Sequence, residues 1–299
     1  MAELSASAGA THASPLQTVV PSRRWDVSRQ FVRNRGAVVG LALVGLCVAL
    51  AVIGPLLTPY DPLDQDLSEA FKPPSPAHPL GADELGRDTL TRLLYGSRIT
   101  LLITLGAVAL SLVFGSWLGL VAGFYGGRVD NLSMRALDIL MAMPGFLLAI
   151  AVIAALGVGT LNLIIAVAAV SIPPFARIAR ASTLSVRNED YILAGRACGA
   201  PNARLMMAHV LPNIAAPLIV QTSLRMATAI LTASGLSFLG LGPAPPAPEW
   251  GAMLSTGRKF ITSHAELATY PGLAILVVTL GFNLFGDGLR DVLDPRLRG

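Results

Sequence analysis

The stretch ILMAMPGFLLAIAVIAALGVGTLNLIIAVAAVSIPPFA spans residues 139–176, and none of its 38 side chains carries a charge. A helix needs about 20 apolar residues to cross the hydrocarbon core of a bilayer, so this stretch is too long for a single crossing. Near its middle lie Gly157 and Gly159, which suit a tight turn. The stretch therefore predicts two membrane-spanning helices joined close to these glycines.

Other tracts with few or no charges extend this interpretation to most of the chain. They cover residues 36–60, 99–127, 205–248 and 267–286, and only His209 and Arg225 interrupt the third of them. All the tracts together predict six helices, with cores near residues 36–57, 99–122, 137–157, 161–178, 214–236 and 270–288. We therefore expect an all-α, polytopic membrane protein.

Composition and the start of the chain agree with a membrane location. Hydrophobic residues make up 53% of the chain and charged residues only 13%, whereas soluble domains carry about 25% charged residues. A polar leader with five arginines precedes the first apolar run, which is longer than the hydrophobic part of a secretory signal peptide. We expect an uncleaved anchor helix, preceded by a disordered cytoplasmic tail over residues 1–24.

Arginine and lysine are distributed unevenly over the segments between the predicted helices. If the N-terminus is cytoplasmic, the cytoplasmic segments hold 15 of these residues and the opposite segments hold 6. Cytoplasmic loops of membrane proteins carry an excess of Lys and Arg. Both termini should therefore be cytoplasmic.

Several classes of chemistry are excluded by the motifs that the sequence lacks. Lys72 follows Phe71 and Lys259 follows Arg258, so neither lysine can belong to a Gly-Lys phosphate-binding loop. Common hydrolase motifs are missing, and the histidines and cysteines do not show the spacing of a zinc site or a disulfide framework. We expect no catalytic site, metal or cofactor in this chain, and no nucleic-acid partner.

The polar segment 177–212 is long for a loop and has a periodic pattern of its own. Asn188 is the expected N-cap of a short helix, and Glu189 and Asp190 are its expected first-turn acids. One face of this helix would carry Tyr191, Ala194, Gly195 and Cys198. Small residues permit close approach of a docking partner, but the spacing fits an interfacial amphipathic helix equally well.

Residues 190–199 (DYILAGRACG), followed by residues 209–213 (HVLPN), resemble the cytoplasmic "EAA" loop of binding-protein-dependent ABC importer permeases. Three further regions resemble the second permease subunit of the dipeptide/oligopeptide/nickel branch of that superfamily. They are HPLGADELGRD at 78–88, SFLGLG at 237–242 with EWGAM at 249–253, and GDGLRDVLDP at 286–295. The resemblance extends over nearly all of residues 25–299.

This resemblance implies the type I ABC importer permease fold and a subunit that forms half of a path for peptides, nickel chelates or glutathione. The implied partners are a second permease subunit, two ABC ATPase subunits that carry ATP and Mg, an extracytoplasmic solute-binding protein, and membrane lipid. The implied location is the cell inner membrane. Residues 25–98 would hold the first helix and an outer loop, and residues 99–299 a permease core whose coupling loop is 177–212.

The resemblance also implies a set of residues that couple this chain to the ATPase: Glu189, Asp190, Tyr191, Ala194, Gly195, Gly199 and Pro212. Leu193 stands where the motif usually has glutamate, so Glu189 and Asp190 are the nearest acids that could present that charge. Helix docking itself does not depend on the motif glutamate.

Arg225 lies in the middle of the fifth predicted helix, where an ionisable residue is costly and often functional. It could contact a substrate carboxylate in the translocation path, or it could pair with Asp138 or snorkel to the membrane surface. We favour the structural alternatives, because no second path-lining charge is visible. The competing hypothesis for the whole chain is a secondary transporter or channel driven by ion gradients, which predicts paired acids inside the membrane.

Overall fold

The structure is a computed structural model that describes residues 31–293, and the named elements in that range are all helices. The long ones are α2 (Arg35–Leu57), α3 (Thr89–Tyr125), α4 (Gly127–Met141), α5 (Gly145–Leu156), α6 (Thr160–Val186), α9 (Leu211–Phe238) and α11 (Glu266–Leu293). The short ones are η1 (Leu67–Glu69), α7 (Asp190–Ala197), α8 (Asn202–Arg204), η2 (Leu205–Val210), α10 (Trp250–Gly257) and η3 (Arg258–Phe260). The predicted tail over 1–24 lies outside the described residues.

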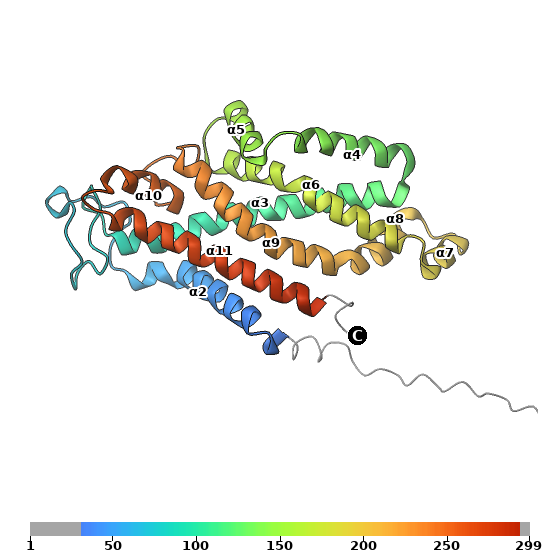
Figure 1. The fold of residues 1–299 in the computed structure, drawn as a ribbon, viewed down its shortest axis with the longest axis horizontal. Coiled ribbons are helices and arrows are strands. Elements are labelled where there is room, and N and C mark those ends of the chain that lie inside the picture. The colour runs from blue at the N-terminus through green and yellow to red at the C-terminus, as the bar shows by residue number, and fades with distance from the viewer. Residues whose placement is uncertain (1–30, 294–299) are drawn as a thin grey trace, which may run out of the picture.

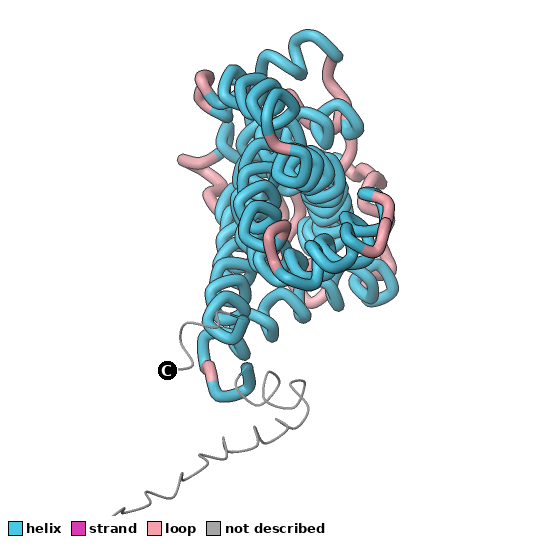
Figure 2. The backbone as a smooth tube through the Cα atoms, turned by 90° about the vertical axis from the view of Figure 1, so that its right-hand side faces the viewer, coloured by secondary structure: helices cyan, strands magenta, loops and turns pink. Residues whose placement is uncertain are grey.

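The long helices other than α5 run along the longest axis of the molecule, with α10 near one end and α7 near the other (Figure 1). We call these the α10 end and the α7 end. Seen from the α7 end, the helices pack around one another as a bundle (Figure 2). Five helices are long and apolar enough to cross a membrane, and the bent pair α4–α5 gives a sixth if it counts as one span.

The bent pair corrects the prediction of a straight third helix over residues 137–157. The axes of α4 and α5 meet at 91°, and Pro144 lies in the break as the N-cap of α5. Proline lacks the N–H that a continuing helix needs, and its ring clashes with the preceding turn. The length of the apolar tract correctly indicated helix, but the prediction of one continuous helix was wrong.

The other five predicted cores lie within observed helices that extend beyond them. α3 begins ten residues early because the Asp88 carboxylate caps it, accepting the N–H of Thr91 at 2.7 Å. The predicted loop over 177–212 is also wrong in extent. Residues 177–186 belong to α6, and residues 202–210 lead into α9 without a break. Only residues 187–201 lie outside long helices, and they contain α7.

A row of glycines brings α3 and α6 into backbone contact. Gly115, Gly119 and Gly123 recur every fourth residue on α3, the small-residue spacing that lets membrane helices approach closely. A Cβ atom at Gly119 would lie 2.1 Å from the carbonyl oxygen of Ala176, and one at Gly115 would lie 2.7 Å from that of Ile172. No larger side chain fits at Gly119 without separating the two helices.

The first helix, α2, is held against α3 by an arginine side chain that binds a backbone carbonyl left without a helical partner. Pro55 lies inside α2, and because it has no N–H the carbonyl of Ala51 loses its helical partner. Arg98 of α3 donates its Nε–H to that carbonyl and its Nη2–H to the carbonyl of Val52 at 2.8 Å. The bonds stabilise the kinked end of α2 and fix it against α3.

Candidate functional sites

α7 is a short helix that projects at the α7 end, between α6 and the helical segment that leads to α9 (Figure 1). Its N-cap is Glu189, whose side chain accepts no capping bond, so the prediction of Asn188 as the N-cap is wrong. Asp190 lies in the first turn as expected. Gly199 ends the segment with a φ of 77°, a left-handed conformation that favours glycine.

The side chains of α7 divide into one buried anchor and an exposed surface. Ile192 is completely buried in the apolar cluster that also contains Leu205. Tyr191 is 46% exposed and Leu193 is 47% exposed, and Ala194 is exposed beside them. We call Tyr191, Leu193 and Ala194 the α7 surface. Apolar side chains at this exposure, on a helix that projects from the bundle, are available to a partner.

Gly195 and Pro212 do not share the α7 surface with these residues. A Cβ atom at Gly195 would lie 2.8 Å from Cδ2 of Leu205, so the close approach that this glycine permits is to its own chain. Pro212 stands in the first turn of α9 and lines an apolar groove with Trp117 of α3. The structure therefore brings together Glu189, Asp190, Tyr191 and Ala194 on α7 and its N-cap, and it places Pro212 on another surface.

Three arginines, from the C-terminal part of α6, its C-cap and α7, contact the last turn of α3 or the first turn of α4. Arg187 donates from Nη1 to the carbonyl of Gly123 at 2.8 Å, and the guanidinium of Arg196 lies 5.0 Å from the centre of the Phe124 ring. Arg180 makes a two-point contact with Asp130 of α4, with Nη2 to Oδ2 at 2.6 Å. The sequence analysis assigned these arginines only to membrane orientation.

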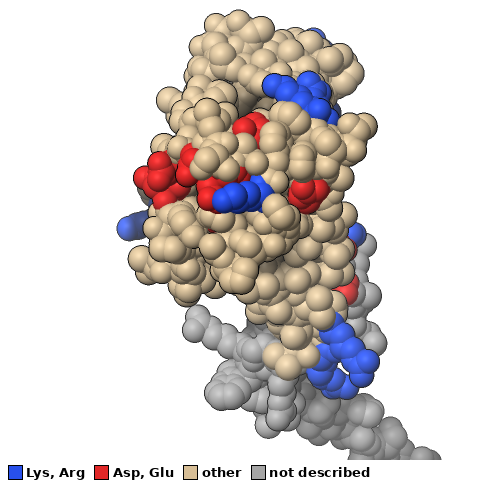
Figure 3. Space-filling view, turned by 90° about the vertical axis from the view of Figure 1, so that its left-hand side faces the viewer, with Lys and Arg blue, Asp and Glu red and all other residues tan. Residues whose placement is uncertain are grey.

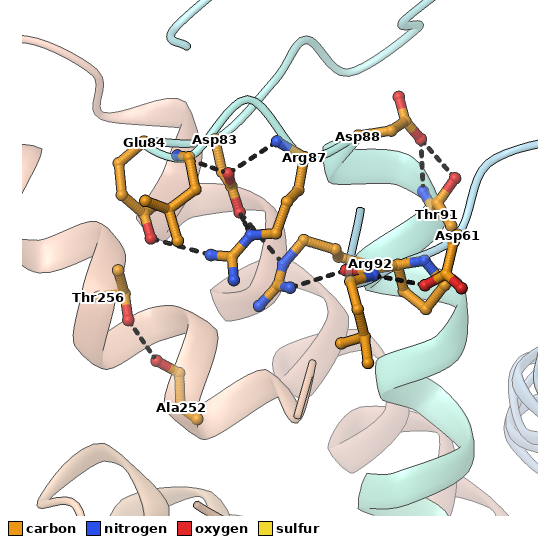
Figure 4. Close-up of polar contacts among 12 residues, drawn as sticks. Asp61, Asp83, Glu84, Arg87, Asp88, Thr91, Arg92, Ala252 and Thr256 are labelled. Carbon is orange, nitrogen blue, oxygen red and sulfur yellow. Dashed lines mark hydrogen bonds and ion pairs between the residues drawn. The ribbon is translucent and has the colours of Figure 1, made fainter. Parts of the chain in front are cut away.

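A buried cluster of charges fastens the segment 58–88 to the bundle at the α10 end (Figure 4). We call Asp83, Glu84, Arg87 and Arg92 the cap cluster. The carboxylate of Asp83 lies 2.7 Å from Nε of Arg87 and 3.2 Å from Nε of Arg92. Arg87 also donates to Glu84 at 2.9 Å, and Arg92 donates to the carbonyl of Pro62 at 2.9 Å. Each buried charge in the cap cluster therefore has an opposite partner.

The segment around the cap cluster is held by further contacts to a histidine. Nδ1 of His78 lies 2.9 Å from the carboxylate of Asp88, and its Nε2 lies 3.4 Å from that of Glu69. The His78 ring stacks on Tyr60 with centroids 4.8 Å apart. Acidic and basic side chains are clustered on this face of the molecule (Figure 3). The acidic, proline-rich segment is thus an ordered cap on the bundle.

Glu249 joins α10 to α3 beneath this cap. Its side chain is completely buried, and its carboxylate accepts the N–H of Ala252 at 2.9 Å and the hydroxyl of Thr100 at 3.3 Å. Burial raises the pKa of Glu249, and the bonds that it accepts oppose that shift only in part. Trp250 donates from Nε1 to the carbonyl of Leu93 at 2.9 Å. The start of α10 is therefore bound to the first turns of α3.

The structure overturns one of the two structural roles that the sequence suggested for Arg225, the pair with Asp138. Asp138 pairs with Arg177 instead, at 2.5 Å, and no acid within residues 31–293 forms an ion pair with Arg225. Arg225 is half-buried and lies 14 residues from Leu211 and 13 from Phe238, or about 20 Å from either end of α9. The guanidinium therefore lies near the middle of α9, without an ion-pair partner among residues 31–293.

Residues 115–299 match the family described as binding-protein-dependent transport system inner membrane component. Residues 22–74 match the N-terminal TM domain of oligopeptide transport permease C. The chain belongs to this family of permeases. A dipeptide transport system permease protein DppC of Alkalihalophilus pseudofirmus is 43% identical over 96% of the chain and 98% of its own length.

Other permeases of the family carry different names at similar identity. A di/tripeptide transport system permease protein DppC of Pseudomonas aeruginosa is 46% identical over 96% of each chain. A glutathione transport system permease protein GsiD of Pectobacterium atrosepticum is 44% identical over 90% of each chain. These findings confirm the predicted family, the all-α polytopic fold and the permease function, and they do not support the alternative of a transporter driven by ion gradients.

The sequence analysis did not predict two sets of contacts that the structure shows. The HPLGADELGRD segment was noticed as a resemblance, but the spacing of Asp83 and Arg87 also indicated a local ion pair within it. The contacts of Arg187 and Arg196 with α3 had no comparable signal, because their partners lie 64 and 72 residues earlier in the chain. The first set orders the segment before α3, and the second fastens the last turn of α3.

Proposed function

We propose that this permease imports peptides or a similar small solute, such as glutathione or a nickel chelate, as one of two permease subunits. Two ABC ATPase subunits would carry ATP and Mg, and an extracytoplasmic solute-binding protein would deliver the solute. This chain would bind no cofactor itself. Support for the solute class comes from the names of the relatives, which include dipeptide, di/tripeptide and glutathione systems.

The α7 surface is the observation that carries the proposed partnership with an ATPase. ATP would close the ATPase dimer, and α7 would move with it and displace α6 and α9, to which it is joined in sequence. Ile192, buried at the base of α7, provides the anchor that makes this connection stiff. The path would then open outward and accept solute from the binding protein. Glu189, Asp190 and Gly199 would shape the ends of this docking helix.

In this proposal the α7 end is cytoplasmic, as are both termini, and the cap faces the binding protein. The excess of arginine and lysine, 15 against 6, supports this orientation. Cys198, at the end of α7, is exposed, whereas Cys47 within α2 is buried. We expect a membrane-impermeant thiol reagent to label Cys198 in inverted vesicles and not in intact cells. The reverse pattern would overturn the orientation.

The proposed partnership is tested by adding partners stepwise to the purified chain. The chain alone should bind no Mg-ATP, because it lacks a phosphate-binding loop, and hydrolysis should appear once the second permease and the ATPase subunits are present. Stoichiometric nucleotide binding by the isolated chain would contradict the proposal. So would failure of the ATPase subunits to co-purify with the permease pair.

Ala194→Trp tests the α7 surface more cleanly than a change at Gly195, because Gly195 packs on Leu205 within the chain. Overfilling a formed contact costs about 1–3 kcal/mol, so the association constant for the ATPase should fall about ten- to a hundredfold. Arg204→Trp, on the exposed face of α8, is the matched control and should leave assembly unchanged. Equal loss in both variants would mean that α7 is not the docking element.

We also propose that Arg225 contacts a substrate carboxylate in the translocation path. Its position near the middle of α9, without an ion-pair partner among residues 31–293, supports this role, and peptides and glutathione carry free carboxylates. Arg225→Gln should therefore slow uptake of a dipeptide more than Arg225→Lys does. The same variant should discriminate less between a dipeptide and its C-terminal amide. Unchanged discrimination would assign Arg225 a structural role.

A further inference from the structure

α3 is fastened to other elements at both ends of the molecule, by contacts that differ in kind. It runs unbroken from Thr89 to Tyr125, 37 residues without a proline, and so extends about 55 Å. That length exceeds the hydrocarbon thickness of roughly 30 Å, so both of its ends emerge from the bilayer. Figure 1 shows it running from the α10 end to the turn into α4.

At the α10 end, the first three turns of α3 are part of the cap. Arg92 binds Asp83 and the carbonyl of Pro62, both in the segment that precedes α3. Leu93 accepts the indole N–H of Trp250, and Thr100 donates to the buried carboxylate of Glu249. The contacts of Arg92 join α3 to the segment 58–88 (Figure 4). The contacts of Leu93 and Thr100 join α3 to α10.

At the α7 end, the last turn of α3 is held by the residues that flank and form α7. Arg187, just before α7, donates to the carbonyl of Gly123 at 2.8 Å, which satisfies a helix-end carbonyl. Arg196, within α7, lies over the face of Phe124 at 5.0 Å, a cation–π geometry. Phe124 is only 4% exposed, so the ring belongs to the packed bundle while the arginine belongs to α7.

Between its ends, α3 is kept straight by its contact with α6. The α6 backbone packs directly against Gly115, Gly119 and Gly123 of α3. The contact is so close that neither helix can move without displacing the other. A rigid element of this kind can carry a displacement from end to end because packed interiors are not readily compressed. α7 therefore has a noncovalent connection to α3, in addition to its connections in sequence to α6 and α9.

We propose that α3 transmits the state of the ATPase to the cap that meets the binding protein, with Phe124, Arg187 and Arg196 as positioning residues at its α7 end. This inference rests on the proposed function, since it requires an ATPase on α7 and a binding protein on the cap. Contiguous packing alone does not demonstrate coupling. Coupling is a free energy that an experiment must measure between the two sites.

The test uses the complete transporter in lipid nanodiscs, with both permeases, the ATPase subunits and the binding protein saturated with dialanine. Three quantities are measured: co-purification of the ATPase subunits, thermal stability, and the ratio of ATP hydrolysis with and without loaded binding protein. Phe124→Leu and Arg196→Gln each remove the cation–π contact from one side. Matched controls are Phe114→Leu, an exposed ring elsewhere on the same helix, and Arg204→Gln, an exposed arginine outside the contact.

We expect each of the two variants to assemble with the ATPase while its stimulation ratio falls about three- to thirtyfold, the range for loss of a cation–π contact. The double variant should lose no more than the worse single variant, because both remove one contact. Arg196→Lys should retain part of the stimulation, since a cation remains over the ring. Both controls should keep the wild-type ratio.

Two results would overturn the role of α3. One is an unchanged stimulation ratio in Phe124→Leu and Arg196→Gln, even if both variants are less stable. The other is a double variant whose loss equals the product of the single losses, which would mean that the residues act separately. If Phe124→Leu does not insert, Arg196→Gln compared with Arg196→Lys decides the question. Failure of the wild-type chain to assemble with an ATPase would instead refute the proposed function.

Discussion

The two ends of the bundle distribute charge and apolar surface in opposite ways. At the α10 end Asp83, Arg87 and Arg92 are each at most 6% exposed and are paired with one another. At the α7 end Tyr191 and Leu193 leave nearly half of their surface exposed. Buried charges need partners because each unpaired ion costs several kcal/mol, whereas exposed apolar surface is costly only until a partner covers it.

This difference indicates that contacts within the chain pair the charges at the α10 end, whereas apolar surface at the α7 end is left for a partner to cover. The cap pairs its own buried charges, so it can hold its shape before any partner arrives. The exposed side chains of the α7 surface have no such pairing, and the buried side chain of α7 is Ile192. Changes at the α10 end should therefore affect the stability of the chain, and changes at the α7 surface should affect assembly.

The largest effect is expected for Asp83→Ala in the cap cluster. Removing this carboxylate leaves Arg87 and Arg92 buried without their shared partner, and breaking a buried pair typically costs about 3–5 kcal/mol. Thermal unfolding in detergent and limited proteolysis of the segment 58–88 would measure the loss. Asp138→Ala is the control, because its pair with Arg177 is half-exposed, with side chains 59% and 48% exposed.

An exposed pair of this kind contributes about 0–1 kcal/mol, so the control should unfold close to the wild-type temperature. An equal loss of stability in Asp138→Ala would contradict the comparison of the two ends, because burial would then not determine what removing an ion-pair partner costs. A cap that resists proteolysis in Asp83→Ala would have the same consequence. In either case the α10 end would owe its order to other contacts, such as those of His78.

A smaller effect, dependent on pH, is expected from Glu249→Gln. Burial raises the pKa of Glu249 above its ordinary value of 4.5, so the folded state binds the proton more tightly than the unfolded state. The associated stability is complete below pH 4.5 and is lost as the pH rises through the folded pKa. Glutamine cannot titrate, yet it keeps an oxygen that can accept the N–H of Ala252.

The measurement is the free energy of unfolding of wild type minus that of Glu249→Gln, across pH 4 to 8. This difference cancels the titration of the other groups and should decline with rising pH, while the variant at neutral pH should differ from wild type by about 1 kcal/mol. A difference that stays flat would mean that Glu249 keeps an ordinary pKa in the fold. A difference that rises with pH would mean that the bonds to its carboxylate outweigh burial.

Sequence patterns predicted the helices well because their main determinant is length without charge. Five of the six predicted cores lie inside observed helices, and a short helix was expected where α7 lies. The failures follow from local chemistry that length does not report. Pro144 breaks the third core, and the cap at Asp88 starts α3 ten residues early.

The candidate site was predicted less completely because its geometry depends on contacts distant in sequence. Gly195 was expected to face a partner, yet Leu205 of the π-helical η2 lies against it. Asp138 was one of the partners considered for Arg225, and no sequence pattern indicated that Asp138 pairs with Arg177. Residues that act through tertiary contacts, such as Phe124 with Arg196, leave no periodic signature in the sequence.

The smallest effect on stability, and the sharpest contrast between the two ends, is expected for Leu193→Ser on the α7 surface. Its side chain is 47% exposed, and surface substitutions away from structural features usually change stability by at most about 0.5 kcal/mol. Leu63→Ser is the matched control at the α10 end, where the side chain is 44% exposed. Thermal unfolding of the isolated chain should place both variants close to wild type.

The two variants should separate when the ATPase subunits are added. Covering a leucine side chain contributes about 1.5–3 kcal/mol, so loss of Leu193 from a formed interface should weaken ATPase binding at least about tenfold. Leu63→Ser should bind the ATPase as wild type does, because it lies on the cap. Equal weakening in both variants would place the interface elsewhere, and a destabilised isolated chain in Leu193→Ser alone would show that this side chain supports the fold.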